Sequence, residues 1–448
     1  MKLKLKDLLA ANPEADLERK TLLTALYDGG KMFEKYKDAF IIKRQVETGS
    51  GSEAGKYYTE RKKRAQYINR CSGVVNWISA TATKDNPRIA TDAPEGSAAD
   101  FWDALNTDTD GSGTPFSSIV RQSIADMLVK EFPYIEVNAE GDKVGKDDYR
   151  LNVIDTLSVL DYEIDENNHI EWIKTHVKTA SRLTTYSKAD EVKNIITIYT
   201  EADTFGYVFY GDNNAYKDAS GNSLTMDTGI SPSADYSATE HAFGQVPIFR
   251  GNSTSFHFVL DRLSEPLKAL YNAEIDLSFA LAVAAYPQLY LKLDGTGRAE
   301  SLVRSELSAV ILNLNEEIGY TSPGNQAFDS LFKNIERIKA SLLESMRMMS
   351  SEAAELPQAG RLSGDAIKQL TTPLQAMIAA ISYPVHDMLM DAINAIRDAR
   401  GDTFNIWIEG FGDSDIEGSI DDSFSDKTDV ISIESGSEKE SEEIEEDE

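Results

Sequence analysis

The sequence predicts an α+β fold in which helices dominate. Three observations favour it: apolar residues recur at helical spacing over long stretches near both ends of the chain, a central stretch is rich in β-branched and aromatic residues, and the end of the chain has few apolar side chains. The chain has 448 residues with 41 % hydrophobic side chains, which suffices for a sizeable core and about two to four structural regions.

Residues 1–150 are expected to be mainly helical. Asn12 can cap a first helix, Pro13 suits its first position, and Gly29-Gly30 provides a natural stop. A second helix is expected over about 31–44, before a Gly- and Ser-rich loop.

A third helix is expected to begin near Lys56. Its apolar stripe has spacings near 3.6 and consists of Tyr58, Ala65, Ile68, Cys71, Val75 and Ile78. The other face carries the strongest basic cluster of the chain, Arg61-Lys62-Lys63-Arg64. Two interpretations stay open for this cluster: a solvated helix face balanced by neighbouring acids, or a contact to phosphate or a partner.

The stretch 85–114 is rich in Asp, Thr, Gly, Ser and Pro and is predicted to form loops, before a helix at 115–130. Residues 106–111 resemble the start of a calcium loop, but Ser117 stands where the bidentate Glu belongs, so a polar turn is expected. Residues 51–56 hint at a phosphate loop but lack its first Gly and its final Ser or Thr, so a linker is expected.

A β-rich region is predicted over 151–262. Its strands are the runs of β-branched and aromatic residues at 158–164, 169–177, 194–200 and 206–210, the first two forming a hairpin around the turn 165–168. The polar stretch 211–240 is expected to be an exposed loop, and Pro247-Ile248 closes the region.

Three long helices are predicted next, over about 264–286, 326–352 and 364–400. Pro373 and Pro384 are expected to kink or break the third helix. The mixed stretch between the first two helices is expected to contain strands at 289–293 and 310–314.

The formal net charge is −30, and the last 36 residues hold 16 acidic and 2 basic side chains. This tail, 413–448, is predicted to be disordered. Such acidity argues against simple affinity for duplex DNA or an anionic membrane. The sequence shows no signal peptide and no apolar run near the ~18 residues of a membrane span, so an intracellular, soluble protein is expected.

No active site is specified by the sequence. The single Cys71 excludes an intrachain disulfide and a Cys-rich zinc module. No histidine pair has the spacing of a zinc enzyme, and no Gly-x-Ser-x-Gly elbow is present. We therefore expect no catalytic residue, no metal and no cofactor.

The order of these elements resembles that of bacteriophage portal proteins, which form the ring at the head–tail vertex through which DNA is packaged and ejected. Residues 57–69 are similar to the N-terminal helix of one portal family, and Val246-Pro247 with 270–278 is similar to the family's entry into its stem. Ser363-Gly364-Asp365-Ala366-Ile367 is similar to the start of the family's kinked helix, with Ile in place of Leu. The resemblance covers most of 30–410, whereas the acidic tail departs from the family's helical crown.

The resemblance implies a portal architecture, region by region. Its parts would be a wing over 1–262 (helical 1–150, β-rich 151–262), stem helices at 263–286 and 326–349, a clip at 287–325 between them, a tunnel loop at 350–362, and a kinked helix over 363–412 that returns to the wing as a reduced crown. The tail 413–448 would follow.

The partners implied are those of the family. The chain would form a homo-oligomer of about 12 subunits, with double-stranded DNA passing through the channel. The terminase large subunit would dock first and a head–tail adaptor later, and the major capsid and scaffolding proteins would surround the ring. The location implied is the portal vertex of the virion, after synthesis in the host cytoplasm, with no membrane partner.

Basic side chains near the channel are the candidate DNA contacts that the resemblance suggests. They are Arg361 in the tunnel loop and Lys333, Arg337, Lys339 and Arg347 on the preceding helix; Arg298 and Arg304 are the candidates in the clip. A net acidic subunit with few positive rings suits a channel that centres DNA without gripping it. A salt bridge to a neighbouring subunit is an equal alternative for the helix cations.

Two other function classes stay open. One is another structural virion protein, such as a capsid or tail subunit, which would be mostly β-sheet. The other is an acidic hydrolase whose site the sequence does not reveal.

Overall fold

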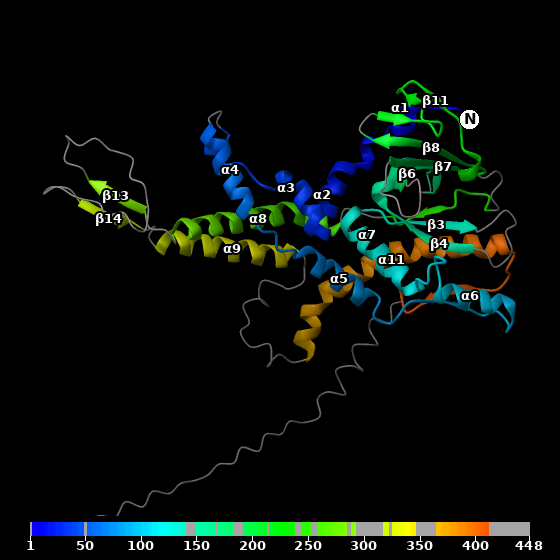
Figure 1. Ribbon diagram of the computed structural model, residues 1–448. Coiled ribbons are helices and arrows are strands. Elements are labelled where there is room, and N and C mark those ends of the chain that lie inside the picture. Colours follow the sequence, from blue (N-terminus) through cyan, green and yellow to red (C-terminus); the bar gives the residue numbers. More distant parts are fainter. Residues whose placement is uncertain are drawn as a thin grey trace, which may run out of the picture. The chain divides into compact units, whose positions relative to one another are not determined.

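The structure is a computed structural model that describes residues 2–48, 52–139, 149–166, 169–181, 191–212, 215–237, 243–252, 258–284, 288–292, 317–321, 325–345 and 364–411 (Figure 1). Helices and strands are both abundant in it and helices prevail, which confirms the predicted α+β class.

The N-terminal part is helical, as predicted, with α1 (Leu5–Leu9), α2 (Leu17–Asp28) and α3 (Gly30–Phe40). The Asn12 side chain accepts a hydrogen bond from the Glu14 N–H and caps the short 3-10 turn that precedes α2. Gly29 ends α2 with φ +65°, and a Cβ there would lie 2.9 Å from the Asn69 amide nitrogen. Glycine is therefore required at this stop by both conformation and space.

The single helix predicted from Lys56 onward is wrong, because the chain forms two helices, α4 (Ser52–Arg64) and α5 (Cys71–Ala82). Tertiary contacts hold the break between them. Tyr67 stacks on Phe33 with ring centroids 3.9 Å apart, and Asn69 donates to the Tyr27 carbonyl while its Oδ1 accepts from the Ser72 N–H. The apolar periodicity gave no sign of this break, because apolar residues before and after it pack into the same core.

The loops predicted over 85–114 are also wrong in part. This stretch contains β2 (Arg88–Thr91) and α6 (Ser97–Thr107), and α6 buries Phe101, Trp102 and Leu105. β2 pairs antiparallel with β15 (Ile406–Glu409), near the far end of the described chain. The predicted helix at 115–130 is confirmed as α7 (Phe116–Lys130).

Two antiparallel sheets form the β-rich region, which begins at Tyr134 rather than at the predicted residue 151. The smaller has the order β12-β3-β4, with β3 (Tyr134–Ala139), β4 (Tyr149–Ile154) and β12 (Ile248–Arg250). The larger follows the chain as a meander, and its strands are β5 (Val159–Ile164), β6 (Ile170–Ser181), β7 (Glu191–Thr200), β8 (Thr204–Asp212), β9 (Ala215–Lys217) and β10 (Ser223–Leu224).

The predicted hairpin and the two strands after it are thus confirmed, whereas 211–240 is not simply a loop. Besides β9 and β10 it contains β11 (Gly229–Ile230), which pairs with β1 (Leu3–Lys4). Between the two sheets the Tyr199 hydroxyl donates to Glu136 Oε1 at 2.8 Å. Burial raises the pKa of the Glu136 carboxyl, and the tyrosine opposes that shift.

The long helices are α8 (Val259–Ala284), α9 (Asn325–Ser345) and α11 (Gly364–Arg400). α8 begins earlier than predicted, so that Pro266 lies inside it. Helix α11 is continuous through both prolines, and its ribbon changes direction along its length, which confirms a bend rather than a break (Figure 1).

Between α8 and α9, β13 (Gln288–Lys292) pairs antiparallel with β14 (Glu317–Thr321). The strand predicted at 289–293 is confirmed, while the one predicted at 310–314 lies outside the described residues. The predicted tail 413–448 lies outside them as well.

The main core joins the helices to the smaller sheet. It contains fully buried side chains of α7 and α11, including Ile124, Leu128, Leu389 and Ile393. In the part of the chain that the structure describes, no helix combines the length and the apolar character needed to cross a bilayer.

Candidate functional site: the paired helices α8 and α9

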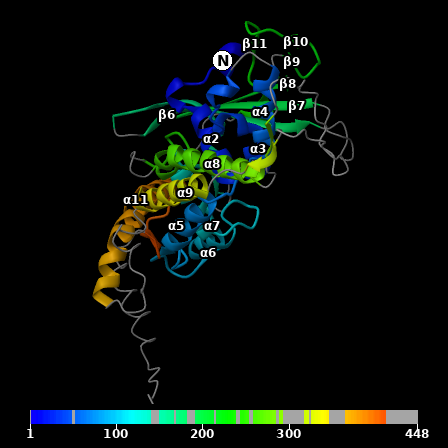
Figure 2. The same ribbon diagram turned by 90° about the vertical axis from the view of Figure 1, so that its left-hand side faces the viewer.

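Helices α8 and α9 lie side by side in both ribbon views (Figures 1 and 2). Leu342 near the end of the described α9 lines the same cavity as Leu260 and Leu263 near the start of α8, so the two helices run antiparallel. The predicted apolar stripe of α9 makes this contact: Ile335 and Leu342 are only 4 % and 5 % exposed. Its last predicted members, Met346 and Met349, lie outside the described residues.

The N-terminal helical part is fastened to α8 by polar side chains. Asn272 on α8 accepts a hydrogen bond from the Ile42 N–H at 2.9 Å and donates to the Phe40 carbonyl at 2.8 Å. Arg44 forms an ion pair with Asp276 at 2.5 Å, and Arg70 forms one with Glu274 at 2.7 Å. The role of these arginines could not be predicted from the sequence, because each pairs with an acid more than 200 positions away.

The basic cluster of α4 splits into two kinds of residue. Arg61 is 2 % exposed and forms an ion pair with the equally buried Glu47 at 2.6 Å, which excludes both a solvated face and a phosphate contact for this residue. Burial alone would raise the pKa of the Glu47 carboxyl, but Arg61 and the Arg44 backbone N–H hold it below its usual value. Lys62 and Lys63 pair near the surface with Asp38 and Glu60, as a solvated face would.

The structure places three of the predicted DNA contacts within two turns of α9. Lys333 and Arg337 are exposed, and Lys339 is half-buried and forms an ion pair with Glu336 at 2.8 Å. Arg337 donates to Asn334 Oδ1 at 3.0 Å. Among the described residues, neither Lys333 nor Arg337 forms an ion pair with a carboxylate. The other candidates, Arg298, Arg304, Arg347 and Arg361, lie outside the described residues.

Two exposed apolar side chains lie on the same helix pair. Leu281 of α8 is 46 % exposed and Phe332 of α9 is 48 % exposed. Both lie toward the end of the pair that leads to β13 and β14, away from Leu342.

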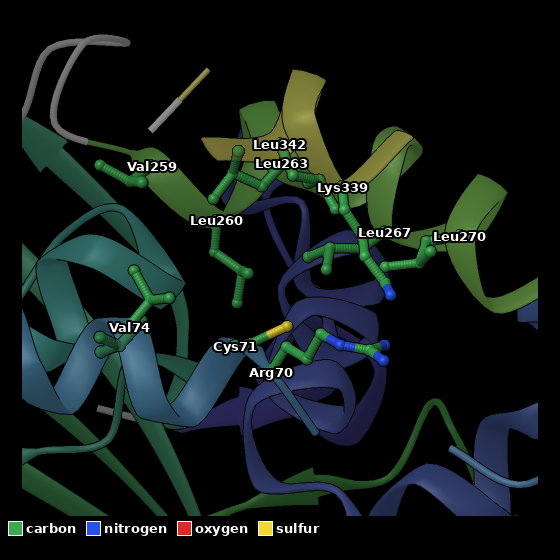
Figure 3. A pocket seen from close by; sticks show the side chains of 11 residues that line it. Arg70, Cys71, Val74, Val259, Leu260, Leu263, Leu267, Leu270, Lys339 and Leu342 are labelled. Carbon is green, nitrogen blue, oxygen red and sulfur yellow. The ribbon is translucent and has the colours of Figure 1, made fainter. Parts of the chain in front are cut away.

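A cavity of about 260 Å³ opens between α5, α8 and α9 (Figure 3). Its walls are leucine and valine side chains together with Cys71, and Arg70 and Lys339 border it. Cys71 is buried, contacts the Tyr67 hydroxyl at 3.3 Å and has a raised thiol pKa because of its burial.

The two loop-like motifs do not form ligand sites. Asp108 and Asp110 use Oδ1 to accept backbone N–H groups of Gly113 and Ser112 at 2.7 and 2.8 Å, so the predicted polar turn follows directly after α6, in which Asn106 itself lies. Ser52 to Lys56 lie in α4, so they form neither a linker nor a phosphate loop. Within the described ranges, no group of three or more His, Cys, Asp or Glu side chains is arranged to hold a metal ion.

Comparisons with known proteins give structural likeness alone. No family model matches the sequence, and no curated protein does. Among solved structures, a chain in the virion of a native gene transfer agent particle is 10 % identical, with a TM-score of 0.40 over 89 % of this chain and 94 % of that one. A neck chain of the empty particle, computed with C6 symmetry, has 10 % identity and a TM-score of 0.41 over 86 % and 94 %. A neck chain of the native particle, computed with C12 symmetry, has 10 % identity and a TM-score of 0.37 over 79 % and 84 %.

Proposed function

We propose that this chain is the portal subunit of a phage-like virion, a non-enzymatic structural protein that assembles into a ring and conducts duplex DNA. The observation that carries the proposal is the antiparallel pair α8 and α9 with the strand pair β13–β14 between them in the chain, followed by the long helix α11. This is the order of stem, clip, stem and kinked helix in the family that the sequence resembles.

The roles of the parts follow from that assignment. The stem would be α8 and α9, and the region containing β13 and β14 would dock the terminase large subunit and later the head–tail adaptor. Lys333 and Arg337, which no described carboxylate neutralises, would line the channel, while the net charge of −30 repels DNA elsewhere. The ring would sit at the capsid vertex among the major capsid and scaffolding proteins.

Ring formation needs apolar surface that a neighbouring copy can cover. Leu281 and Phe332 offer such surface on the helix pair, at a place where each side chain would otherwise stay in water. In a ring about one axis, the same height of each subunit meets the next, so these side chains would meet the neighbouring helix pair.

The test is electron microscopy of the purified full chain with light scattering on matched variants. We expect closed rings of about a dozen subunits with a central channel for the natural sequence. The double variant Leu281→Ser, Phe332→Ser should lower the assembled fraction, because each serine removes apolar contact from the interface. The variant Val177→Ser, at a strand position 46 % exposed, should assemble normally.

Other outcomes separate the alternatives. Shells or tubes without closed rings would indicate a capsid or tail subunit, and a monodisperse monomer near 50 kDa across salt conditions would contradict the portal assignment. Hydrolytic turnover by the purified chain would favour the enzyme alternative.

A further inference from the structure

We propose that the cavity between α5, α8 and α9 is a binding site for a single-chain amphiphile with an anionic head group, such as a medium-chain carboxylate. The proposal is independent of the portal assignment, since it concerns one subunit and a small molecule. It follows from the walls, the volume and the charges at the border of the cavity (Figure 3).

Apart from Arg70 and Lys339 at the border, the walls offer a guest mainly apolar contact. Six of the lining side chains are each at most 9 % exposed: Val75, Leu260, Leu263, Leu267, Leu270 and Leu342. Water gains no hydrogen bonds from such walls, and apolar cavities of this kind stay dry and take up apolar guests. The cavity therefore favours a hydrocarbon over water.

The volume fixes the length of the guest. An apolar cavity of about 150 Å³ accommodates benzene, with six carbons. By proportion, the 260 Å³ here hold a chain of about ten carbons. This is the size of one short acyl chain rather than of a two-chain lipid.

The charge at the border selects the head group. Figure 3 shows the Lys339 ammonium and the Arg70 guanidinium reaching the same side of the cavity from α9 and from the residue before α5. Arg70 is bound to Glu274 at 2.7 Å, and Lys339 to Glu336 at 2.8 Å.

The Lys339–Glu336 and Arg70–Glu274 ion pairs differ in how easily they break. Glu336 is 70 % exposed, and an exposed pair of this kind within one helix contributes little to stability. Lys339 can therefore exchange Glu336 for the carboxylate of a guest, whereas the guanidinium of Arg70 remains on the more buried Glu274. Lys339 is therefore the head-group ligand, while Arg70 stays paired with Glu274 beside it.

The first experiment titrates the full chain calorimetrically with straight-chain carboxylates below their micelle concentrations. From hexanoate to decanoate, we expect affinity to rise about fourfold for each added methylene, and to level off beyond about ten carbons when the cavity is full. Octanoate should bind more tightly than octanol, and octylammonium should not bind. Affinity that keeps rising with chain length, or equal binding of octylammonium, would overturn the proposal.

The second experiment uses Cys71, the one cysteine of the sequence, as a reporter inside the cavity. Its alkylation by iodoacetamide is followed by intact mass. Decanoate at ten times its Kd should slow the reaction about tenfold, because occupied protein is shielded. An unchanged rate would place the bound carboxylate elsewhere.

Matched variants assign the residues. Leu263→Phe should fill the cavity and abolish binding, whereas Leu277→Phe on the same helix, which does not line the cavity, should bind normally. Lys339→Met should lose the preference for octanoate over octanol, whereas Lys333→Met should keep it. Circular dichroism and thermal melting confirm that each variant is folded, and a Leu263→Phe protein that is folded and still binds decanoate would refute the site.

Discussion

Helices α4 and α9 each carry a cluster of basic residues, and the two clusters have different fates in the fold. On α4, Arg61 is buried against Glu47 and also lies 3.5 Å from Asp276 of α8, so its charge is neutralised within the subunit. On α9, Lys333 and Arg337 stay exposed and pair with no described carboxylate. Where the acids lie, rather than how many cations a helix carries, decides which cluster remains available to a ligand.

Among these variants, replacing the buried Arg61 of α4 should lower the free energy of unfolding most. Arg61→Met leaves the Glu47 carboxylate buried without its partner, and we expect the free energy of unfolding to fall by about 3–5 kcal/mol in urea titrations. The control is Lys63→Met two residues later, whose ion pair with Glu60 is exposed and whose loss should cost less than about 1 kcal/mol. Equal losses of unfolding free energy for the two variants would contradict the claim that the buried Arg61 pair matters more than the exposed Lys63 pair.

Glu136 is a buried acid that pairs with no cation among the described residues, so its effect on stability should depend on pH. Within the described chain, Glu136 has only the Tyr199 hydroxyl as partner, and its pKa is raised by burial. Its stabilising effect is thus fully present below the unfolded pKa near 4.5 and is lost as pH rises through the higher folded value. Relative to the natural sequence, Glu136→Gln should be more stable at pH 8 than at pH 4.

The readout is the difference in unfolding free energy between the two proteins, measured from pH 4 to pH 8. If the stability of Glu136→Gln relative to the natural sequence does not rise toward pH 8, the Glu136 carboxyl is ionised at little cost in the folded state. Glu47, held below its usual pKa by Arg61, should give the opposite trend.

The smallest effect on stability is expected on α9. Replacing Lys333 and Arg337 by Gln should change the unfolding free energy by no more than about 0.5 kcal/mol, because both are exposed. If they face DNA in the proposed ring, the slope of log affinity against log salt should shrink by about 2 per subunit. The matched control replaces the exposed Lys63 and Arg64 of α4, and an equal change in slope there would remove the special role of α9.

Much of the fold could be predicted from local patterns. The helices α7, α8 and α9 and the hairpin of β5 and β6 have strong periodicity or clear turn residues, so neighbouring positions alone specify them. The missed elements depend on distant partners. β2 is a short strand in a polar stretch, and only its pairing with β15 fixes it as a strand.

The site was predictable in part for the same reason. The stripe of α9 and the exposed Lys333 and Arg337 follow from helical spacing. The burial of Arg61 could not be read from the sequence, because a run of four basic residues gives no indication that one of them meets Glu47 and Asp276. The cavity beside α5 was equally hidden, since it exists only where three separate helices meet.

The pairing of β2 with β15 also sets a time order for the newly made chain. Arg88 and Glu409, which join the two strands by an ion pair at 2.6 Å, are 321 positions apart. At about 5–20 residues per second, the ribosome adds that length in roughly 15 to 65 seconds, and β2 waits for its partner strand throughout. A chain that stops before residue 406 lacks that partner, so prematurely terminated products carry an unpaired strand edge near their N-terminal helices. The β2–β15 sheet can therefore form only after residues 406–409 have been made.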